Sequence, residues 1–328
     1  LFTDARIHFK ENLAPVLAPS FILTYHHGGL YFDLKEPSYE NISLKGSEVK
    51  ILNLLNTHSN LKLKIRANTR FDSTVQHLLK AYNLKIPVNQ KSGTVNALFM
   101  ADLGLKNSYQ DFYVNVDFSK GDIGLDKVNL SIEKGNLQYK NGYINLKNIY
   151  LKDTRYEGEL NGKIDLKKKK SDLILDAKMI TLGDEKETFF ILKDERLPFV
   201  LNYEKGIEIV IPKLYTRLTN VLNETHIYLT DLNKIKPYLL DPEFIEQGGN
   251  VDISTTDFKT YSIEGILKRT TCFLYEEDHQ CKARVPFWAK VSANDIDFFA
   301  FEKRFYYNKA KSQIKLTNLN FDLALCLQ

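Results

Sequence analysis

The side chains that most often carry catalysis or metal binding are sparse in this chain. His26 and His27 form the one adjacent histidine pair, and Gly28-Gly29 follows them. Neighbouring residues on a strand point to opposite faces, so the two imidazoles can share a metal ion only if a turn redirects one of them. We interpret both as loop histidines.

Three cysteines lie towards the C-terminal end, at Cys272, Cys281 and Cys326. Cys272 and Cys281 flank the polar segment 276–280 and could close a hairpin through a disulfide, which would imply an oxidising compartment. Two unpaired thiols are the alternative. A metal site made of Cys272, His279 and Cys281 is disfavoured, because the spacing matches no common zinc pattern.

No catalytic motif is present. The sequence has no P-loop, no GxGxxG after a strand, no HExxH and no GxSxG. Acidic residues are scattered along strand faces and turns, and a β-helical carbohydrate-active enzyme would need them clustered on one face. We therefore expect no catalytic residues, no metal and no cofactor, and predict that the protein is not an enzyme.

The charge balance narrows the class of protein. The 328 residues include 45 basic and 41 acidic ones, for a net charge of +4, which does not fit a dedicated nucleic-acid binder. The one charge run, Lys167 to Lys170, is typical of a solvated hairpin tip, and contact with anionic lipid headgroups is the alternative. No apolar stretch is long enough to span a bilayer, and the chain begins without Met, as a mature chain or excised segment would.

Short segments of alternating apolar and polar residues fill the stretch from 112 to 211, beginning with Phe112-Tyr113-Val114. A period of two gives each strand one apolar and one polar face, and Asn141-Gly142 is typical of a tight hairpin turn. The sequence therefore predicts a long antiparallel meander. From the strand phase we place the following residues on its apolar face: Phe112, Val114, Val116, Val128, Leu130, Ile132, Ile144, Leu146, Leu160, Ile164, Leu173, Leu175, Ile207 and Ile209.

Two arrangements can accommodate this face. Two sheets can stack and bury their apolar sides in a closed sandwich. Alternatively, one strongly curved and twisted sheet forms an elongated trough (a β-taco) whose apolar inner face stays open as a groove suited to acyl chains. The alternation is the same in both arrangements.

Helical signals appear in three places. Residues 47–55 predict a short helix, residues 72–84 an amphipathic helix capped by Asp72 or Ser73, and residues 230–240 a second amphipathic helix. At an offset of 156 residues, Gly93 aligns with Gly249, which suggests an internal repeat. The predicted organisation is a β-rich segment (1–70), a helix plus β-meander (71–229) and a second, truncated helix plus β-meander (230–328).

The order of these elements resembles the AsmA-like family of Gram-negative envelope proteins, closest to its YhdP and TamB relatives. The resemblance covers residues 60–328. It rests on the helix Val75–Tyr82 before Pro87, the strand start Gly93–Ala97, the Gly-punctuated segment Tyr156–Leu166, and the helix Leu232–Leu240 before Gly249.

This resemblance implies a section of a bridge that carries phospholipid from the inner to the outer membrane through a periplasmic β trough. We therefore expect a non-enzymatic lipid-transfer protein that binds phospholipid or another acyl lipid. The resemblance also implies a periplasmic location, an inner-membrane anchor that this chain lacks, and other envelope proteins as partners, but no nucleic acid. The alternative is a β-rich envelope scaffold or adhesion protein with closed cores and no lipid.

Overall fold

The structure is a computed structural model of the chain. It describes residues 1–8, 11–81, 88–125, 128–182, 188–240, 242, 245, 247–257, 259–268, 284–300, 303–308, 311 and 313–317. Two compact units are present, one formed by residues 1–168 and 173–179 and the other by residues 169–172 and 180–328. The predicted segment boundaries near residues 70 and 229 stay predictions.

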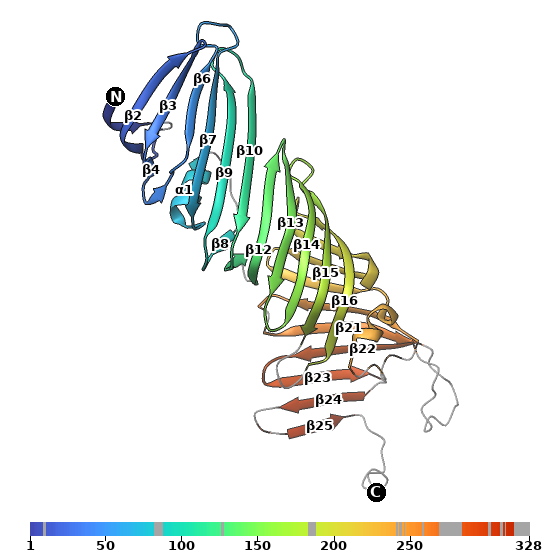
Figure 1. Cartoon of the computed structure of the whole chain (residues 1–328). Helices are drawn as coiled ribbons and strands as arrows, with labels where there is room; N and C mark the ends of the chain where they lie inside the picture. Colours follow the sequence, from blue (N-terminus) through green and yellow to red (C-terminus); the bar gives the residue numbers. More distant parts are fainter. Residues whose placement is uncertain are drawn as a thin grey trace. The chain divides into compact units, whose positions relative to one another are not determined.

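The first unit is an antiparallel sheet with one helix (Figure 1). Its elements are β1 (Phe2–Ile7), β2 (Val16–His26), β3 (Gly29–Lys35), β4 (Ser38–Tyr39), β5 (Ile42–Ser43), β6 (Glu48–Leu52), β7 (Asn60–Thr69), α1 (Ser73–Ala81), β8 (Val88–Gln90), β9 (Val95–Gly104), β10 (Gln110–Phe118), β11 (Gly121–Leu125), β12 (Val128–Lys140), β13 (Tyr143–Lys152) and β14 (Tyr156–Asp165). The strands follow one another across the sheet in the order β1-β2-β3-β6-β7-β9-β10-β12-β13-β14, and every pair is antiparallel.

The second unit is an antiparallel meander in which each strand pairs with the next one from β16 to β25. Its elements are β16 (Phe190–Asn202), β17 (Ile207–Ile211), η1 (Pro212–Leu214), β18 (Thr216–Val221), β19 (Glu224–Leu229), η2 (Leu232–Lys234), η3 (Lys236–Tyr238), β20 (Gly249–Thr255), β21 (Tyr261–Lys268), β22 (Arg284–Val291), β23 (Asp295–Ala300), β24 (Lys303–Asn308) and β25 (Gln313–Thr317). Strand β15 (Lys170–Leu182) contributes residues to both units. The predicted fold class, mainly β with an open antiparallel meander, is confirmed.

The helix predicted at residues 72–84 is confirmed over Ser73–Ala81, as α1, and residues 82–84 lie outside the described part of the chain. Asp72 caps it, because its Oδ1 accepts hydrogen bonds from the backbone N–H groups of Thr74 (3.0 Å) and Val75 (3.2 Å). Val75 and Leu78 are three residues apart and therefore lie on one face of the helix. Both pack against the buried cluster of Tyr39, Ile42 and Leu44. The same cluster contacts β7, so α1 lies against one end of the sheet.

Two helix predictions are wrong. Residues 48–52 form strand β6, because Val49 pairs with Leu63 in β7 and the sheet overrides the local helical pattern. Residues 232–238 form the two short 3-10 turns η2 and η3 instead of an α-helix. Pro237 explains the second error, since proline lacks an N–H and its ring clashes with the carbonyl four residues earlier in an α-helix.

Candidate lipid-binding face

The apolar side chains of the first unit form continuous rows across the sheet. Residues that pair directly in an antiparallel ladder point to the same face, so the pairings define each row. One row crosses β7, β9, β10, β12, β13 and β14 and consists of Ile65, Phe99, Val114, Tyr139, Ile144 and Ile164. The next row consists of Ala67, Ala97, Val116, Leu137, Leu146 and Gly162. Phe112 pairs with Ala101 on the same face.

Register shifts between β12 and β13 keep the N-terminal half of β12 on this face. Ile132 and Leu137 are five residues apart, so an unbroken strand would point them to opposite faces. Ile132 instead pairs with Leu151, and shifts in register separate this pair from that of Leu137 and Leu146. On β14, Leu151 pairs with Gly158 and Leu146 pairs with Gly162. These two glycines are four residues apart, so they belong to the same face of the strand. Ile132 is therefore on the apolar face, where it is buried.

The other residues predicted for the apolar face of the first unit lie on β12, β14 and β15. Leu130 and Val128 pair with Ile123 and Leu125 of β11, two and four residues from Ile132, and the side chain of Val128 is outside the described part. Leu160 pairs with the buried Ile149. Leu173 is buried, and Leu175 is two residues further along β15, where its Cδ1 is 3.2 Å from the position that a Cβ on Gly158 would occupy.

The second unit carries a longer apolar row, most of which the sequence prediction missed. Ile209 belongs to it, whereas Ile207 pairs with Asn220 and is 45% exposed. The row crosses β16 to β24 and consists of Leu201, Ile209, Leu218, Ile227, Ile253, Ile263, Ala289, Phe298 and Phe305. The alternation in these strands was a usable signal, and extending the phase of β17 through each hairpin would have found the row.

The opposite face of the first unit is mostly polar. The row beside Val116 and Leu146 consists of Asn68, Asn96, Asp117, Asn136 and Lys147. Hydrogen bonds cross the strands within this row, from Asn68 Nδ2 to Asn96 Oδ1 (2.6 Å) and from Asn136 Nδ2 to Asp117 Oδ1 (2.7 Å). One side of the same strands is therefore apolar and the other side polar.

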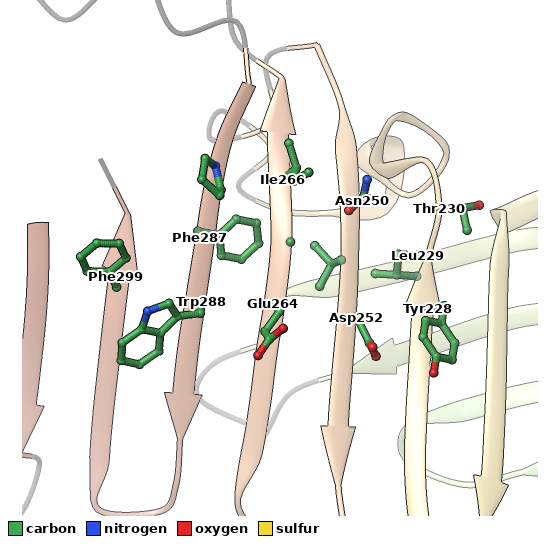
Figure 2. Close-up of a pocket in the computed structure, with 13 residues that line it drawn as sticks. Tyr228, Leu229, Thr230, Asn250, Asp252, Glu264, Ile266, Phe287, Trp288 and Phe299 are labelled. Carbon is green, nitrogen blue, oxygen red and sulfur yellow. The ribbon is translucent and has the colours of Figure 1, made fainter. Parts of the chain in front are cut away.

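A hollow of about 680 Å³ lies on the second unit, on the face opposite to Ile253 and Ile263 (Figure 2). Two rows of side chains line it across β19 to β23. The first row consists of Tyr228, Asp252, Glu264, Trp288 and Phe299, and the second of Thr230, Asn250, Ile266 and Pro286. The backbone of the row between them, from Leu229 to Phe287, completes the lining.

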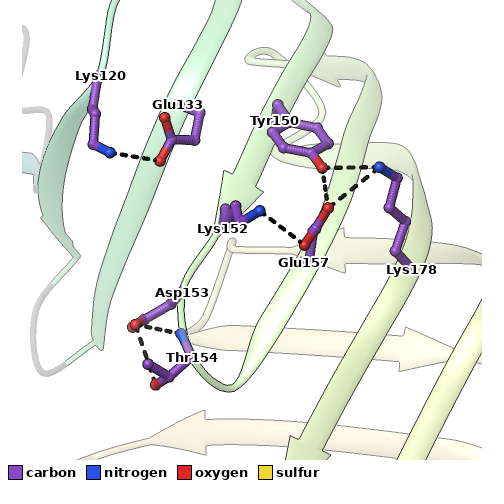
Figure 3. A network of polar contacts seen from close by, with 8 residues as sticks. All are labelled: Lys120, Glu133, Tyr150, Lys152, Asp153, Thr154, Glu157 and Lys178. Atoms are coloured by element: carbon purple, nitrogen blue, oxygen red, sulfur yellow. Dashed lines mark hydrogen bonds and ion pairs between the residues drawn. The ribbon is translucent and has the colours of Figure 1, made fainter.

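Carboxylates on the polar face of the first unit are held by ion pairs and hydrogen bonds. Glu157 accepts from the hydroxyl of Tyr150 and contacts the ammonium groups of Lys152 (3.2 Å) and Lys178 (3.3 Å), as Figure 3 shows. These contacts, that of Tyr150 first, lower the pKa of Glu157 to about 2. Within the described residues, no group of three or more potential ligands is placed to hold a metal ion. The network therefore links β13, β14 and β15 through side-chain contacts.

The histidine pair and the cysteine pair are the other groups singled out in the sequence. His27 lies in the β2–β3 turn as predicted, with φ of 50°, whereas His26 is the last residue of β2. Their Nδ1 atoms are 3.0 Å apart, and the ring of His26 stacks on Tyr31. The proposed disulfide of Cys272 and Cys281 lies outside the described residues. In the described part of the chain, no helix is long and apolar enough to cross a membrane.

Comparison with known protein families matches residues 2–180, more than half of the chain, to the YhdP protein family. The chain belongs to the YhdP family. No curated protein and no solved structure matches it. Membership of the YhdP family indicates an envelope protein with a general role in lipid transport. The matched span contains both apolar rows of the first unit.

Proposed function

We propose that this YhdP-family chain is a non-enzymatic lipid-binding section of a bridge that transfers phospholipid between the inner and outer membranes. The observation that carries the proposal is the set of uninterrupted apolar rows, six strands wide in the first unit and nine strands wide in the second. In this proposal the protein works in the periplasm, attached to the inner membrane.

The burial of the apolar face favours an occupant over a closed core. Phe99, Val114 and Ile144, in the middle of the first row, are only half-buried. A second layer packed on this face would bury them almost completely, as the two sheets of a sandwich do. The alternative function, a scaffold or adhesion protein with closed cores, requires such a layer over the whole face, whereas the side chains of Phe99, Val114 and Ile144 stay partly exposed.

The interaction with an acyl chain would be spread over many residues. Covering apolar surface contributes roughly 25 cal/mol per Å², or about 0.8 kcal/mol for each buried methylene. Because every row offers similar aliphatic and aromatic groups, lipid can slide from one row to the next without a large change in free energy. A surface of this kind suits transfer better than tight storage, and no single aliphatic contact dominates.

Two neighbouring substitutions on β13 test this proposal. Leu146→Asp places a carboxylate on the apolar face, whereas Lys147→Asp changes the adjacent residue on the polar face. We expect Leu146→Asp, and likewise Val116→Asp in the same row, to lower the phospholipid that co-purifies with the chain about tenfold, because an unpaired charge against an acyl chain costs more than the ~1.4 kcal/mol that a factor of ten represents. Native mass spectrometry and lipid extraction measure the bound lipid.

Lys147→Asp is the matched control and should retain wild-type lipid. Circular dichroism of all three variants verifies that the strands form. Equal lipid content in Leu146→Asp and Lys147→Asp, with both folded, would contradict the assignment of the apolar face as the lipid site. Absence of lipid from the wild-type chain expressed in a Gram-negative envelope would favour the scaffold function.

A further inference from the structure

The hollow on the second unit has an aromatic wall. Trp288 and Phe299 are paired on β22 and β23, and their rings are stacked with nearly parallel planes, 13° apart, and 6.0 Å between centroids. Figure 2 shows both side chains at one end of the hollow. The guanidinium of Arg304 is 5.7 Å from the Trp288 ring and is held by Asp297 through its Nε (2.8 Å). The result is an apolar aromatic surface held in place by its neighbours.

Hydrogen-bonding groups line the rest of the hollow. Asp252 and Glu264 provide carboxylates, Asn250 an amide, and Tyr228 and Thr230 hydroxyl groups. Among the contacts of the described residues, none engages the carboxylate of Glu264. Such groups can accept several hydrogen bonds from a ligand rich in hydroxyl groups, and bonds to a carboxylate are the stronger ones.

Asp252 is oriented for the same purpose. The Nδ1 atom of His226 is 3.2 Å from Asp252 Oδ1, and the His226 ring stacks on Tyr228 at 5.5 Å with 6° between the planes. His226 thus holds Oδ1 of Asp252, and this contact does not involve Oδ2. The row from Tyr228 to Glu264 is therefore partly fixed before any ligand arrives, which lowers the entropic cost of binding.

The charge of the lining selects among ligands. It contains two carboxylates and no Lys, Arg or His, so it repels phosphate and other anionic groups. A cationic ligand can pair with these carboxylates, but Arg304 already occupies a cation–π position on Trp288, 5.7 Å from the ring centroid. A neutral ligand with an apolar face and many hydroxyl groups uses both the aromatic rings and the carboxylates.

We propose that this hollow binds a neutral glycan, with a pyranose ring stacked on the wall formed by Trp288 and Phe299. The C–H groups on one face of the sugar pack on the rings, and its hydroxyl groups donate to Glu264 and Asp252. The hollow is on the face opposite to the apolar row of this unit, so the inference does not depend on the proposed lipid function. It gives the polar face a role of its own, attachment to a saccharide.

The chain offers a direct probe of this site, because Trp288 is its only tryptophan. Titration of the 328-residue chain with chitotetraose, maltotetraose and cellotetraose should give a saturable change in tryptophan emission with at least one of them. By calorimetry, Trp288→Ala should weaken that binding about tenfold or more, and Glu264→Gln roughly two- to tenfold, as expected for losing an aromatic contact or a charge-assisted hydrogen bond. Trp288→Phe, which keeps an aromatic ring, should retain most of the affinity.

Ser262→Ala is the matched control, since Ser262 is two residues from Glu264 on the same strand and face and is not part of the lining. It should bind the sugar as the wild-type chain does. Three results would overturn the proposal: no response to any of the three sugars at millimolar concentration, equal weakening by Ser262→Ala and Trp288→Ala, or binding of tetralysine in place of the sugars. Loss of lipid in Leu146→Asp leaves sugar binding unchanged, so the two proposals fail separately.

Discussion

Two segments of the chain begin differently and then become alike. The helix-led segment runs from Ser73 to Gly104 and the turn-led segment from Leu232 to Thr255, and Gly93 in the first occupies the place of Gly249 in the second. Both glycines have positive φ, +82° and +142°, and each precedes or begins an apolar strand. In both, an added Cβ would collide with a backbone carbonyl oxygen, of Lys120 at 2.3 Å or of Ile266 at 2.1 Å.

The helical parts of the two segments are different. Ala81, the last residue of α1, corresponds to Pro237 in the turn-led segment, where two 3-10 turns replace the α-helix. The turn-led segment still buries Leu232 and Ile235. The comparison indicates that the close approach of the glycine to the sheet and the phase of the following strand are the shared features. The element before them only has to cover one end of the sheet with apolar side chains.

The largest expected effect comes from the shared glycines. Gly249→Ala and Gly93→Ala should each lower the free energy of unfolding by about 2–3 kcal/mol, because a side chain there is strained by positive φ and also meets backbone atoms. Urea unfolding followed by circular dichroism measures the change.

Gly28→Ala separates these two causes. Gly28 has φ of +71°, and no atom lies within 4 Å of its Cβ position, so its substitution should cost only the ~1 kcal/mol of the left-handed conformation. If Gly249→Ala costs no more than Gly28→Ala, the close approach of the backbone is not what the turn-led segment requires, and the likeness between the two segments loses its physical basis.

Strand phase was predictable from the sequence because it is a local property. The alternation around Val114 or Ile144 specifies which side chains share a face as long as the strand is unbroken. It does not specify the partner strand, so the alignment of Ile65 with Phe99, across the intervening α1, came only from the structure. Residues 48–52 show the same limit, since their helical pattern yields to pairing with β7.

The hollow could not have been predicted for a related reason. Its lining comes from five strands, and Trp288 meets Glu264 and Phe299 only through the register of two separate ladders. Each residue looks unremarkable in its own segment: a carboxylate on a polar face, or an aromatic ring in a strand. The pairing of long-range neighbours, which sequence periodicity does not contain, is what makes them a site.

The caps of the two segments should have a smaller effect than the glycines. Asp72 accepts two backbone hydrogen bonds at the start of α1, whereas Asp231 accepts one, from Asn233 at 3.0 Å, at the start of η2. Asp72→Ala should lower the free energy of unfolding by about 1 kcal/mol. Asp231→Ala should lower it by only about 0.3 kcal/mol, because a single 3-10 turn has fewer N–H groups to satisfy. Urea unfolding compares the two.

Asn at either position is the control, since its side-chain oxygen also accepts a capping hydrogen bond. Both Asn variants should remain close to wild type. An equal loss in Asp72→Ala and Asp231→Ala would mean that the turn-led segment depends on its cap as strongly as the helix does, and that the two segments are more alike than their secondary structure indicates.

Another small effect concerns a hydrogen bond between the turn-led segment and β16. The hydroxyl of Tyr238 donates to Glu195 Oε1 in β16 (2.8 Å), and Lys213 also binds this carboxylate. Lys213 first, and then Tyr238, lower the pKa of Glu195 below its ordinary value of 4.5. A lowered pKa stabilises the folded state above the unfolded pKa, and this contribution disappears as the pH falls through the folded value.

Tyr238→Phe should therefore lower the free energy of unfolding by roughly 0.5 kcal/mol at neutral pH, since one hydrogen bond to a partly exposed carboxylate is lost. The difference from wild type should shrink as the pH falls below 4.5, where Glu195 in the unfolded chain is protonated and the folded-state carboxylate follows. Urea unfolding from neutral pH down to about pH 3 measures this. Tyr215→Phe, which changes a half-exposed tyrosine on the neighbouring turn η1, should show no such dependence on pH. A Tyr238→Phe difference that stays constant across this range would mean that the phenol stabilises the turn-led segment by packing on Phe190 and not through the Glu195 carboxylate.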